Sequence, residues 1–439
     1  MNVLSDPYRR RWIGYGFLVA AFFLVSFHRL TTAVLSEELM RTFDTTGASL
    51  GLLHSSFFIL YAIFQVPSGV LADQQGARRI GAGGTVLMSL GAIVFGMAPT
   101  YTVAFLGRLI VGFGSSVLFV STLRFCANWF EPSEFGTMTG LTFTIGIFGG
   151  LAASTPLALA ISAIGWRPTM TGLGLVGLGL AAGIFLLSQN SPEVAGLPPI
   201  DEVPDMPSQS FADIRGHLTT AVKERETWLL GIVLFLLTGI GITIVGLWGI
   251  PFMVQLYDIS VTDASVYILI GSAGGLIGPT LIGWISDRLE RRTELIVLAT
   301  AAFATTWGIL AVLGTPPLIF IAVLLFISRV LRGGVPLAFT VIKERHHQGA
   351  SGTVISLVNM MGWIGASIFP VLLGGILDAY WTGETVDGTR LYTVLGYRVA
   401  FGIAAVSGIV AVVCAVWLHV RHTRNHSSGA MTDASRESV

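Results

Sequence analysis

Positively charged side chains interrupt several long apolar stretches of this sequence. Arg29 follows His28 in "FLVSFHRLTTAV", and Arg108 lies in "GRLIVGFGSS". His54 lies in a third apolar stretch, and its imidazole could carry a proton near neutral pH. The planar guanidinium group suits two-point binding of a carboxylate or a phosphate. The chemistry that these residues suggest is therefore recognition of an anion.

Three further arginines lie in apolar stretches later in the chain. Arg124 lies toward the end of its stretch, and Arg329 and Arg332 lie together, just ahead of a glycine pair. No carboxylate lies near the centre of any apolar stretch, since Glu37 and Asp378 lie at the ends of theirs. Arginine side chains without acidic partners in the apolar stretches predict that a negatively charged ligand, not part of the protein, pairs with them.

The composition predicts what surrounds these charges. Of the 439 residues, 53% are hydrophobic and only 11% are charged, against about 25% charged residues in soluble proteins. This predicts a membrane protein with several spans in a lipid bilayer. A charged side chain at the bilayer centre costs roughly 2.5–3.5 kcal/mol on insertion scales, so each cation should face a cavity or a partner.

Other classes of function find no support in the residue types. Cys126 and Cys414 are too few to predict a disulfide framework. The sequence contains no nucleotide-binding loop, metal-ligand cluster or catalytic triad. We therefore expect no enzymatic activity, no cofactor, no metal and no nucleic-acid partner.

Twelve apolar runs are long enough to span a bilayer, which takes about 20 residues. They are 12–35, 48–72, 77–96, 100–128, 134–163, 166–188, 227–254, 262–286, 292–313, 316–343, 348–379 and 395–420.

A polar, proline-rich linker divides these spans into six plus six. The predicted parts are an N-terminus at 1–11, a first half at 12–188, the linker at 189–226, a second half at 227–420 and a tail at 421–439. Most Lys and Arg residues outside the spans fall on the side of the two termini. By the positive-inside rule, both termini are cytoplasmic and the protein is a multi-pass protein of the plasma membrane.

The two halves share a short motif. Gly69 and Asp73 in "GVLADQQGARR" recur as Gly283 and Asp287 in "GWISDRLERR", after the second span of each half. We expect these glycines to let helices approach closely, and the aspartates to cap the next helix and hold the arginines that follow. The first copy also contains Gly76, Arg78 and Arg79.

These motifs, together with "GRLIVGFGSS", resemble the signatures of the major facilitator superfamily. The resemblance implies an all-α fold of twelve transmembrane helices in two six-helix bundles around a central cavity, working by alternating access. "LLHSSFFILYAIFQVPSG" and "FHR" are similar to the organic-anion branch, which includes anion:cation symporters and sugar-phosphate antiporters. That branch implies substrate contact by Arg29, and roles for His54 and Arg108 in the site or its coupling.

The sequence departs from this branch at two places. Ser115 lies where an acidic residue is expected, and the seventh span lacks the second substrate arginine of the sugar-phosphate antiporters.

Helix geometry places Arg29, His54 and Arg108 in one layer, about 9–12 Å below the outer surface at about 1.5 Å per residue. Arg332 is the expected partner of Arg29 across the cavity, whereas Arg329 should mirror Arg108. The predicted substrate-binding residues are Arg29, Arg108, Arg332, His54, Tyr61 and Asn359. The predicted coupling or gating residues are His28, His54, Arg124 and Arg329.

Structural roles compete with several of these predictions. Arg108 could hold main-chain carbonyls of the first two spans, and His28 could be a packed or capping histidine. Arg124 could reach the interface or pair with Glu131 or Glu134.

The sequence thus predicts a secondary carrier for small organic anions, carboxylates or organophosphates, working alone as a monomer. Exchange against a counter-anion and proton-linked symport both fit. An exporter of drugs or cations is an alternative, but such a protein would be expected to have an acidic residue within the transmembrane spans. A solute sensor that does not transport is a second alternative, because such sensors resemble carriers residue for residue.

Overall fold

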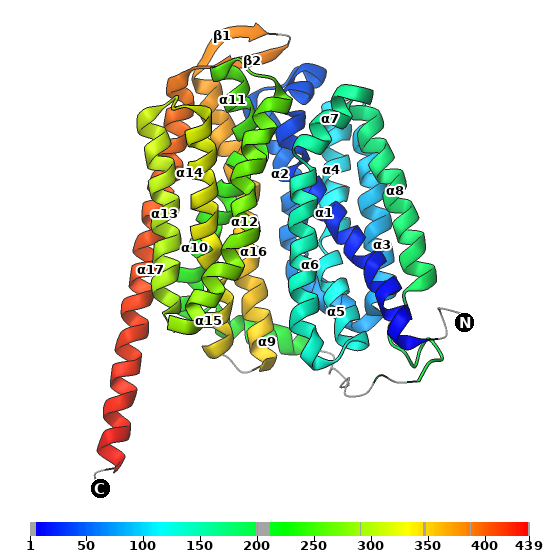
Figure 1. Cartoon of the computed structure of the whole chain (residues 1–439), viewed down its shortest axis with the longest axis vertical. Coiled ribbons are helices and arrows are strands. Elements are labelled where there is room, and N and C mark those ends of the chain that lie inside the picture. Colours follow the sequence, from blue (N-terminus) through cyan, green and yellow to red (C-terminus); the bar gives the residue numbers. More distant parts are fainter. Residues whose placement is uncertain are drawn as a thin grey trace.

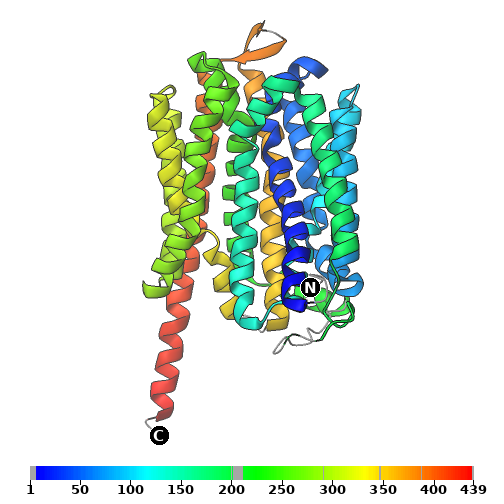
Figure 2. The same ribbon diagram turned by 45° about the vertical axis from the view of Figure 1, so that its right-hand side comes forward.

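The computed structural model describes residues 6–198, 200, 211–289, 291–345, 348–386 and 388–437. Long helices run roughly parallel in two groups, with α1–α8 in one group and α10–α17 in the other (Figure 1). A two-stranded hairpin lies at one end of the molecule, and both termini lie toward the other end in both views (Figures 1 and 2). We call these ends the hairpin face, with residues 381–392, and the terminal face, where α1 begins.

Several spans of the first half are broken into two helices. Phe64 separates α2 from α3, and a short break separates α4 from α5. The helices are α1 Pro7–Phe43, α2 Gly47–Ile63, α3 Gln65–Gly96, α4 Tyr101–Ser115, α5 Leu118–Trp129, α6 Pro132–Ala152, α7 Thr155–Ile164 and α8 Trp166–Leu187.

The second half follows the linker helix α9, Phe211–Ala221, and has broken spans of its own. A π-helix and a 3-10 turn lie between α-helices in its first and fourth spans. The elements are α10 Arg225–Thr243, η2 Ile244–Trp248, α11 Gly249–Tyr257, α12 Val261–Leu289, α13 Arg292–Leu313, α14 Leu318–Leu331, η3 Arg332–Gly334, α15 Leu337–Arg345, α16 Gln348–Ala379 and α17 Val394–Glu437.

Within the described residues, 11 helical segments are long and apolar enough to cross a membrane. One of them, α3, bends at Gly76 and so contains the end of the second predicted span and all of the third. Helix α2 supplies the start of the second span, which makes twelve spans in total. The predicted all-α fold of twelve transmembrane helices is confirmed.

Gly76 is required at its bend for two reasons. Its φ of 81° lies in the region that residues with a Cβ rarely adopt. A Cβ at this position would also collide with the side chain of Asn190. The chain can therefore reverse direction tightly between the second and third spans only with glycine here.

The hairpin between α16 and α17 was not foreseen from the sequence. Strands β1 Trp381–Val386 and β2 Thr389–Tyr392 pair antiparallel, with Thr385 opposite Arg390.

The two halves meet through helix pairs that cross between them. Helix α16 packs against α2, α12 against α7, and α1 against η2. Ser265 of α12 donates a hydrogen bond to Thr155 of α7, at 2.9 Å. These contacts join the halves on the side of the hairpin face.

Candidate functional site

A cavity of about 550 Å³ lies between the two halves. Each half contributes residues spaced so that they share one face of a helix. Helix α1 presents Phe22, Ser26 and Arg29, and α16 presents Ile355, Asn359 and Trp363 at intervals of four. The cavity therefore lies where the two bundles face each other.

Arg29 contacts both halves of the molecule inside this cavity. Its Nη2 donates a hydrogen bond to the Tyr61 hydroxyl at 3.3 Å. Its guanidinium carbon lies 4.4 Å from the ring centroid of Trp363 in the second half, and 5.3 Å from that of Tyr61. Ring faces attract a cation without neutralising it. Arg29 is thus oriented by aromatic rings and keeps its charge available.

Arg329 brings a second positive charge to the same cavity from α14. It makes no hydrogen bond or ion pair with any residue that the structure describes. Gly274 and Gly275 of α12 lie beside its side chain, and no Asp or Glu is among the cavity residues. A low-dielectric cavity with two cations and no carboxylate favours an anionic occupant.

Other polar atoms at the Arg29 end of the cavity also lack partners. The Arg29 Nε, the Trp363 Nε1 and the Gln65 Oε1 are buried and make no hydrogen bond within the described chain. Buried polar groups in folded proteins are nearly always paired. The two N–H groups could donate to a bound anion, and the Gln65 carbonyl oxygen could accept from a ligand hydroxyl.

Arg108 does not line the cavity. Arg108 is only 1% exposed. Its Nη1 donates hydrogen bonds to the His28 carbonyl at 2.8 Å and to the Thr31 hydroxyl at 3.1 Å. Its Nη2 donates to the Thr32 hydroxyl, also at 3.1 Å. These contacts match the structural role considered for Arg108, on the main chain of the first span. Because they fix the residue before Arg29, Arg108 can position Arg29 without touching a ligand.

Arg332 makes contacts like those of Arg108, but in the second half. Its Nη2 donates to the Leu237 carbonyl of α10 at 2.9 Å, and its guanidinium lies 5.1 Å from the Phe303 ring. It does not line the cavity. The residue that faces Arg29 across the cavity is thus Arg329, and Arg332 is the structural counterpart of Arg108. Arg329 and Arg332 are three residues apart, which places their side chains only about 60° apart around the helix, so the packing decides which of them lines the cavity.

The two histidines lie outside the cavity lining. His28 is buried beside Phe27, with a centroid distance of 6.1 Å between their rings. His54 is fully buried, and neither ring nitrogen has a partner among the described residues. A Cβ at Gly246 of η2 would lie 3.5 Å from the His54 Cε1. His54 therefore sits where the two halves meet, between the cavity and the hairpin face.

Tyr61 and Asn359, both predicted to bind substrate, line the cavity. Arg124 does not line it. It forms an ion pair with Asp73 at 3.4 Å rather than with Glu131 or Glu134. Glu134 instead binds Arg11, with two hydrogen bonds of 2.7 and 3.0 Å.

The motif after the second span differs in detail from the expected arrangement. Arg78 donates to Gln189 and to the Phe185 carbonyl, at 3.1 and 2.6 Å, so Asp73 does not hold it. Arg79 and Asp287 are exposed. Among the described residues, no atom would lie within 4 Å of a Cβ at Gly69 or Gly283. The described part of the chain therefore does not show the close helix approach expected at these glycines.

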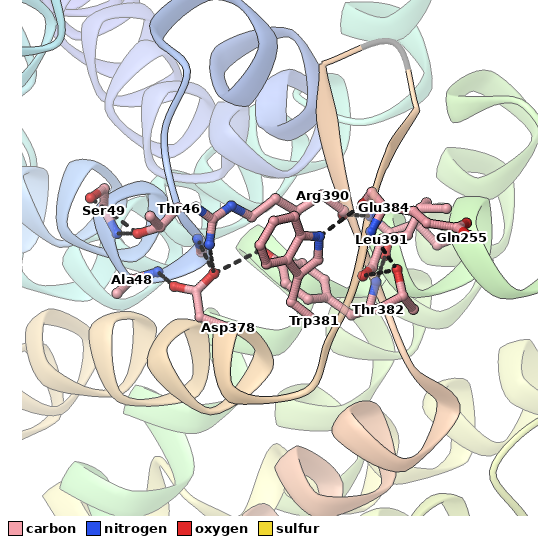
Figure 3. Close-up of polar contacts among 12 residues, drawn as sticks. Thr46, Ala48, Ser49, Gln255, Asp378, Trp381, Thr382, Glu384, Arg390 and Leu391 are labelled. Atoms are coloured by element: carbon pink, nitrogen blue, oxygen red, sulfur yellow. Dashed lines mark hydrogen bonds and ion pairs between the residues drawn. The ribbon is translucent and has the colours of Figure 1, made fainter.

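A polar network at the hairpin face joins the two halves, and sequence analysis did not predict it (Figure 3). The Asp378 carboxylate at the end of α16 accepts hydrogen bonds from the main-chain N–H groups of Gly47 and Ala48, both at 2.8 Å. These are the first N–H groups of α2, so a carboxylate of the second half caps a helix of the first. The one available signal was an acidic residue at the end of a long apolar run.

The hairpin holds Asp378 from the other side. Arg390 Nη1 and the Tyr392 hydroxyl donate to it at 3.3 and 3.4 Å. Burial first, and the negative charge of Asp378 second, raise the pKa of Tyr392 well above its usual range. The phenol therefore stays protonated and remains a donor.

Comparison with known proteins finds one family and many relatives. The family model described as the Major Facilitator Superfamily matches residues 3–370. The chain is 25% identical over 390 residues to the membrane sensor protein UhpC of Salmonella typhimurium, covering 85% of each chain. It is 26% identical over 356 residues to the glycerol-3-phosphate transporter of Bacillus subtilis, covering 76% of this chain and 79% of the relative.

The fold is also similar to that of solved transporters. A bacterial homolog of the human lysosomal transporter Spinster, in an inward-facing and occupied conformation, superimposes with a TM-score of 0.74. The sequence identity is 17%, and the match covers 94% of this chain and 97% of the other. At that identity the likeness concerns the fold.

Proposed function

The chain belongs to the Major Facilitator Superfamily, and we propose that it carries a small organic anion, a carboxylate or an organophosphate, across the membrane by alternating access. One observation carries this proposal. Arg29 and Arg329 face one cavity from opposite halves, and no carboxylate lines that cavity. The glycerol-3-phosphate transporter among the relatives carries a substrate of this charge.

The proposed cycle follows from the two cations. An anion enters the cavity, engages Arg29 and Arg329, and screens their mutual repulsion, so the halves can close around it. An empty cavity would resist closure because two like charges would approach each other in a low dielectric. This favours exchange of one anion for another. A proton on His54 or on the substrate would permit symport instead.

The proposed orientation puts both termini in the cytoplasm, and the hairpin face outside the cell. In this orientation the structure is closed to the outside. The proposed units are the bundles 12–188 and 227–420, joined by the linker 189–226, working as a monomer in the plasma membrane.

The test is the substitution Arg29→Gln in purified protein reconstituted into liposomes. Truncating one partner of a buried charge pair costs about 2–5 kcal/mol, so anion uptake should fall by at least about 30-fold. Arg9→Gln, an exposed arginine near the start of α1, is the matched control and should retain full uptake. Full uptake by Arg29→Gln would overturn the assignment.

Two alternatives remain distinguishable by the same assay. The sensor among the relatives suggests anion sensing, for which the protein would bind an anion, dependent on Arg29, without net uptake. A carrier of cations would need a negative group in the cavity, and the lining residues include none.

A further inference from the structure

The cavity walls are far more apolar than a site for a sugar phosphate requires. We infer that the substrate is an amphipathic anion, a carboxylate attached to an aromatic or cycloaliphatic group, rather than a polyhydroxylated phosphate. This inference rests on the proposed function and concerns the same cavity.

Aromatic side chains form one continuous wall in the first half. The rings of Phe22 and Phe119 lie 5.2 Å apart, and those of Phe119 and Phe143 lie 4.9 Å apart, measured between centroids. All three line the cavity, and Phe339 lines it from the second half. Flat or cyclic apolar groups pack well against such walls, because aromatic rings offer large apolar faces at fixed positions.

The wall lies at the right distance from the cationic end. Phe22 precedes Arg29 by seven residues on the same face of α1, which corresponds to two helical turns, or about 10.5 Å. A carboxylate held by Arg29 would therefore place the body of its molecule beside Phe22 and Phe119. Because helical side chains lean toward the helix N-terminus, the Arg29 guanidinium covers part of this distance, and a ring attached directly to a carboxylate can reach the wall.

Few groups are available to pair with hydroxyls. The uncharged polar residues of the lining are Ser26, Tyr61, Gln65, Thr139, Ser272 and Asn359. The Tyr61 hydroxyl already accepts a hydrogen bond from Arg29 at 3.3 Å, and Thr139 donates to the Phe135 carbonyl at 2.9 Å. Ser26 lies about one turn of α1 before Arg29, near the charged end, and the Gln65 carbonyl oxygen could accept from a single ligand hydroxyl. A sugar with four or five hydroxyls would thus lose hydrogen bonds to water that the walls do not replace, and each unpaired buried hydroxyl weakens binding.

A matched pair of ligands tests the inference. Cyclohexanecarboxylate and quinate share a ring and a carboxylate, but quinate carries four ring hydroxyls. Titration calorimetry on the full chain in lipid nanodiscs, with empty nanodiscs as the reference, measures both. We expect cyclohexanecarboxylate and benzoate to bind at least tenfold more tightly than quinate and glucose 6-phosphate. Quinate or glucose 6-phosphate binding as tightly as cyclohexanecarboxylate would overturn the inference.

Two variants locate the selectivity in the aromatic wall. Phe119→Ser should weaken the binding of cyclohexanecarboxylate and leave that of quinate nearly unchanged. The ratio of the two affinities should therefore fall to about threefold or less. Phe148→Ser is the control, since Phe148 lies on α6, is 51% exposed and does not line the cavity, and it should keep the full ratio. An unchanged ratio in Phe119→Ser would also refute the inference.

Failure of this inference and failure of the proposed function give different results. If quinate and glucose 6-phosphate bind the parent as tightly as cyclohexanecarboxylate does, but do not bind Arg29→Gln, only the inferred substrate class is wrong. If no anion binds, or Arg29→Gln binds every anion as tightly as the parent, the anion site itself is wrong.

Discussion

The two ends of the molecule differ in how closely the halves approach each other. At the hairpin face, α2 and α16 are in main-chain contact. A Cβ at Gly51 would collide with the Pro370 carbonyl, and one at Gly374 would collide with the Gly47 carbonyl. Glycines at such positions let helix backbones meet directly. Asp378 completes the seal by capping α2.

The terminal face has similar residue types, but its described residues make none of these contacts. A Cβ at Gly69 or Gly283 would meet no described atom within 4 Å, and Asp73 pairs with Arg124 of its own half. Asp287 is exposed. Glycines and an aspartate thus join the two halves at the hairpin face. The corresponding residues at the terminal face make no such contact between the halves among the described residues. We infer that the structure is one end state of the cycle and that the motif glycines serve the opposite state.

The largest effect is expected from filling a glycine at the closed end. In Gly51→Val the added side chain meets main chain, which cannot move aside, so α2 and α16 should separate at the hairpin face. Overpacking of this kind costs about 1–3 kcal/mol or more, which corresponds to a shift of about 5- to 150-fold or more toward the open state. Uptake should fall, because the closed state becomes rarer.

A cysteine at Ser26, in a chain without Cys126 and Cys414, measures this opening. Ser26 lines the cavity, so an impermeant thiol reagent added on the hairpin side should label it only when that face opens. Labelling should rise by about 5- to 150-fold in Gly51→Val and should not rise in Gly69→Val, where the described residues leave room in the present conformation. Equal labelling in both variants would contradict the comparison between the two ends.

The next largest effect is expected from Asp378→Asn. The neutral amide cannot accept both main-chain hydrogen bonds, and it loses the charge that favours a helix N-terminus. Loss of a helix cap costs about 0.5–2 kcal/mol, so labelling of the Ser26 cysteine from the hairpin side should rise about 2- to 30-fold.

Glu384→Gln is the control for Asp378→Asn, because it removes a carboxylate from the exposed strand β1 at the same face of the molecule, without a contact to α2 among the described residues. Labelling in this control should equal that of the parent. A rise as large as that of Asp378→Asn would mean that the charge of the whole face matters, and not the cap.

The sequence was sufficient for the transmembrane spans but not for the rotation of each helix. The apolar runs predicted the twelve spans, because hydropathy along the chain reflects contact with lipid. Depth along a helix placed Arg29 and Arg108 in one layer, but only the packing shows that Arg29 faces the cavity and Arg108 faces the helix beside it. A single residue turns the side chain by about 100°, so depth alone cannot distinguish the two.

The same limit explains why Arg329, and not Arg332, lines the cavity. The two residues lie only about 60° apart around the helix, a difference that the sequence cannot resolve. The hairpin had a usable signal, since "TVDGTR" contains an Asp-Gly pair typical of two-residue turns. Asp378 could not be recognised as a cap from sequence, because its partners lie more than 300 residues away.

A smaller effect is expected from Arg390→Gln. Its ion pair with Asp378, at 3.3 Å, is partly open to solvent, with side chains 28% and 18% exposed. Pairs of this kind contribute about 0.2–1 kcal/mol, and Asp378 keeps its two main-chain donors. Labelling of the Ser26 cysteine from the hairpin side should rise no more than about fivefold. A rise beyond that of Asp378→Asn would show that the hairpin, not the cap on α2, holds the face closed.

The smallest effect is expected at Tyr392, and it should appear only at high pH. The hydroxyl donates to Asp378 at 3.4 Å, near the upper limit for a hydrogen bond, so Tyr392→Phe should change labelling less than about twofold at pH 7. The pKa of Tyr392 is raised in the folded protein, chiefly by burial and then by Asp378. Its contribution to stability is therefore complete below the ordinary tyrosine pKa of about 10 and is lost as the pH rises above it.

Thermal unfolding of the parent and of Tyr392→Phe should differ by a constant amount up to about pH 9, and the parent should then lose stability faster. A difference that already changes near neutral pH would mean that Tyr392 is not the neutral donor in this network.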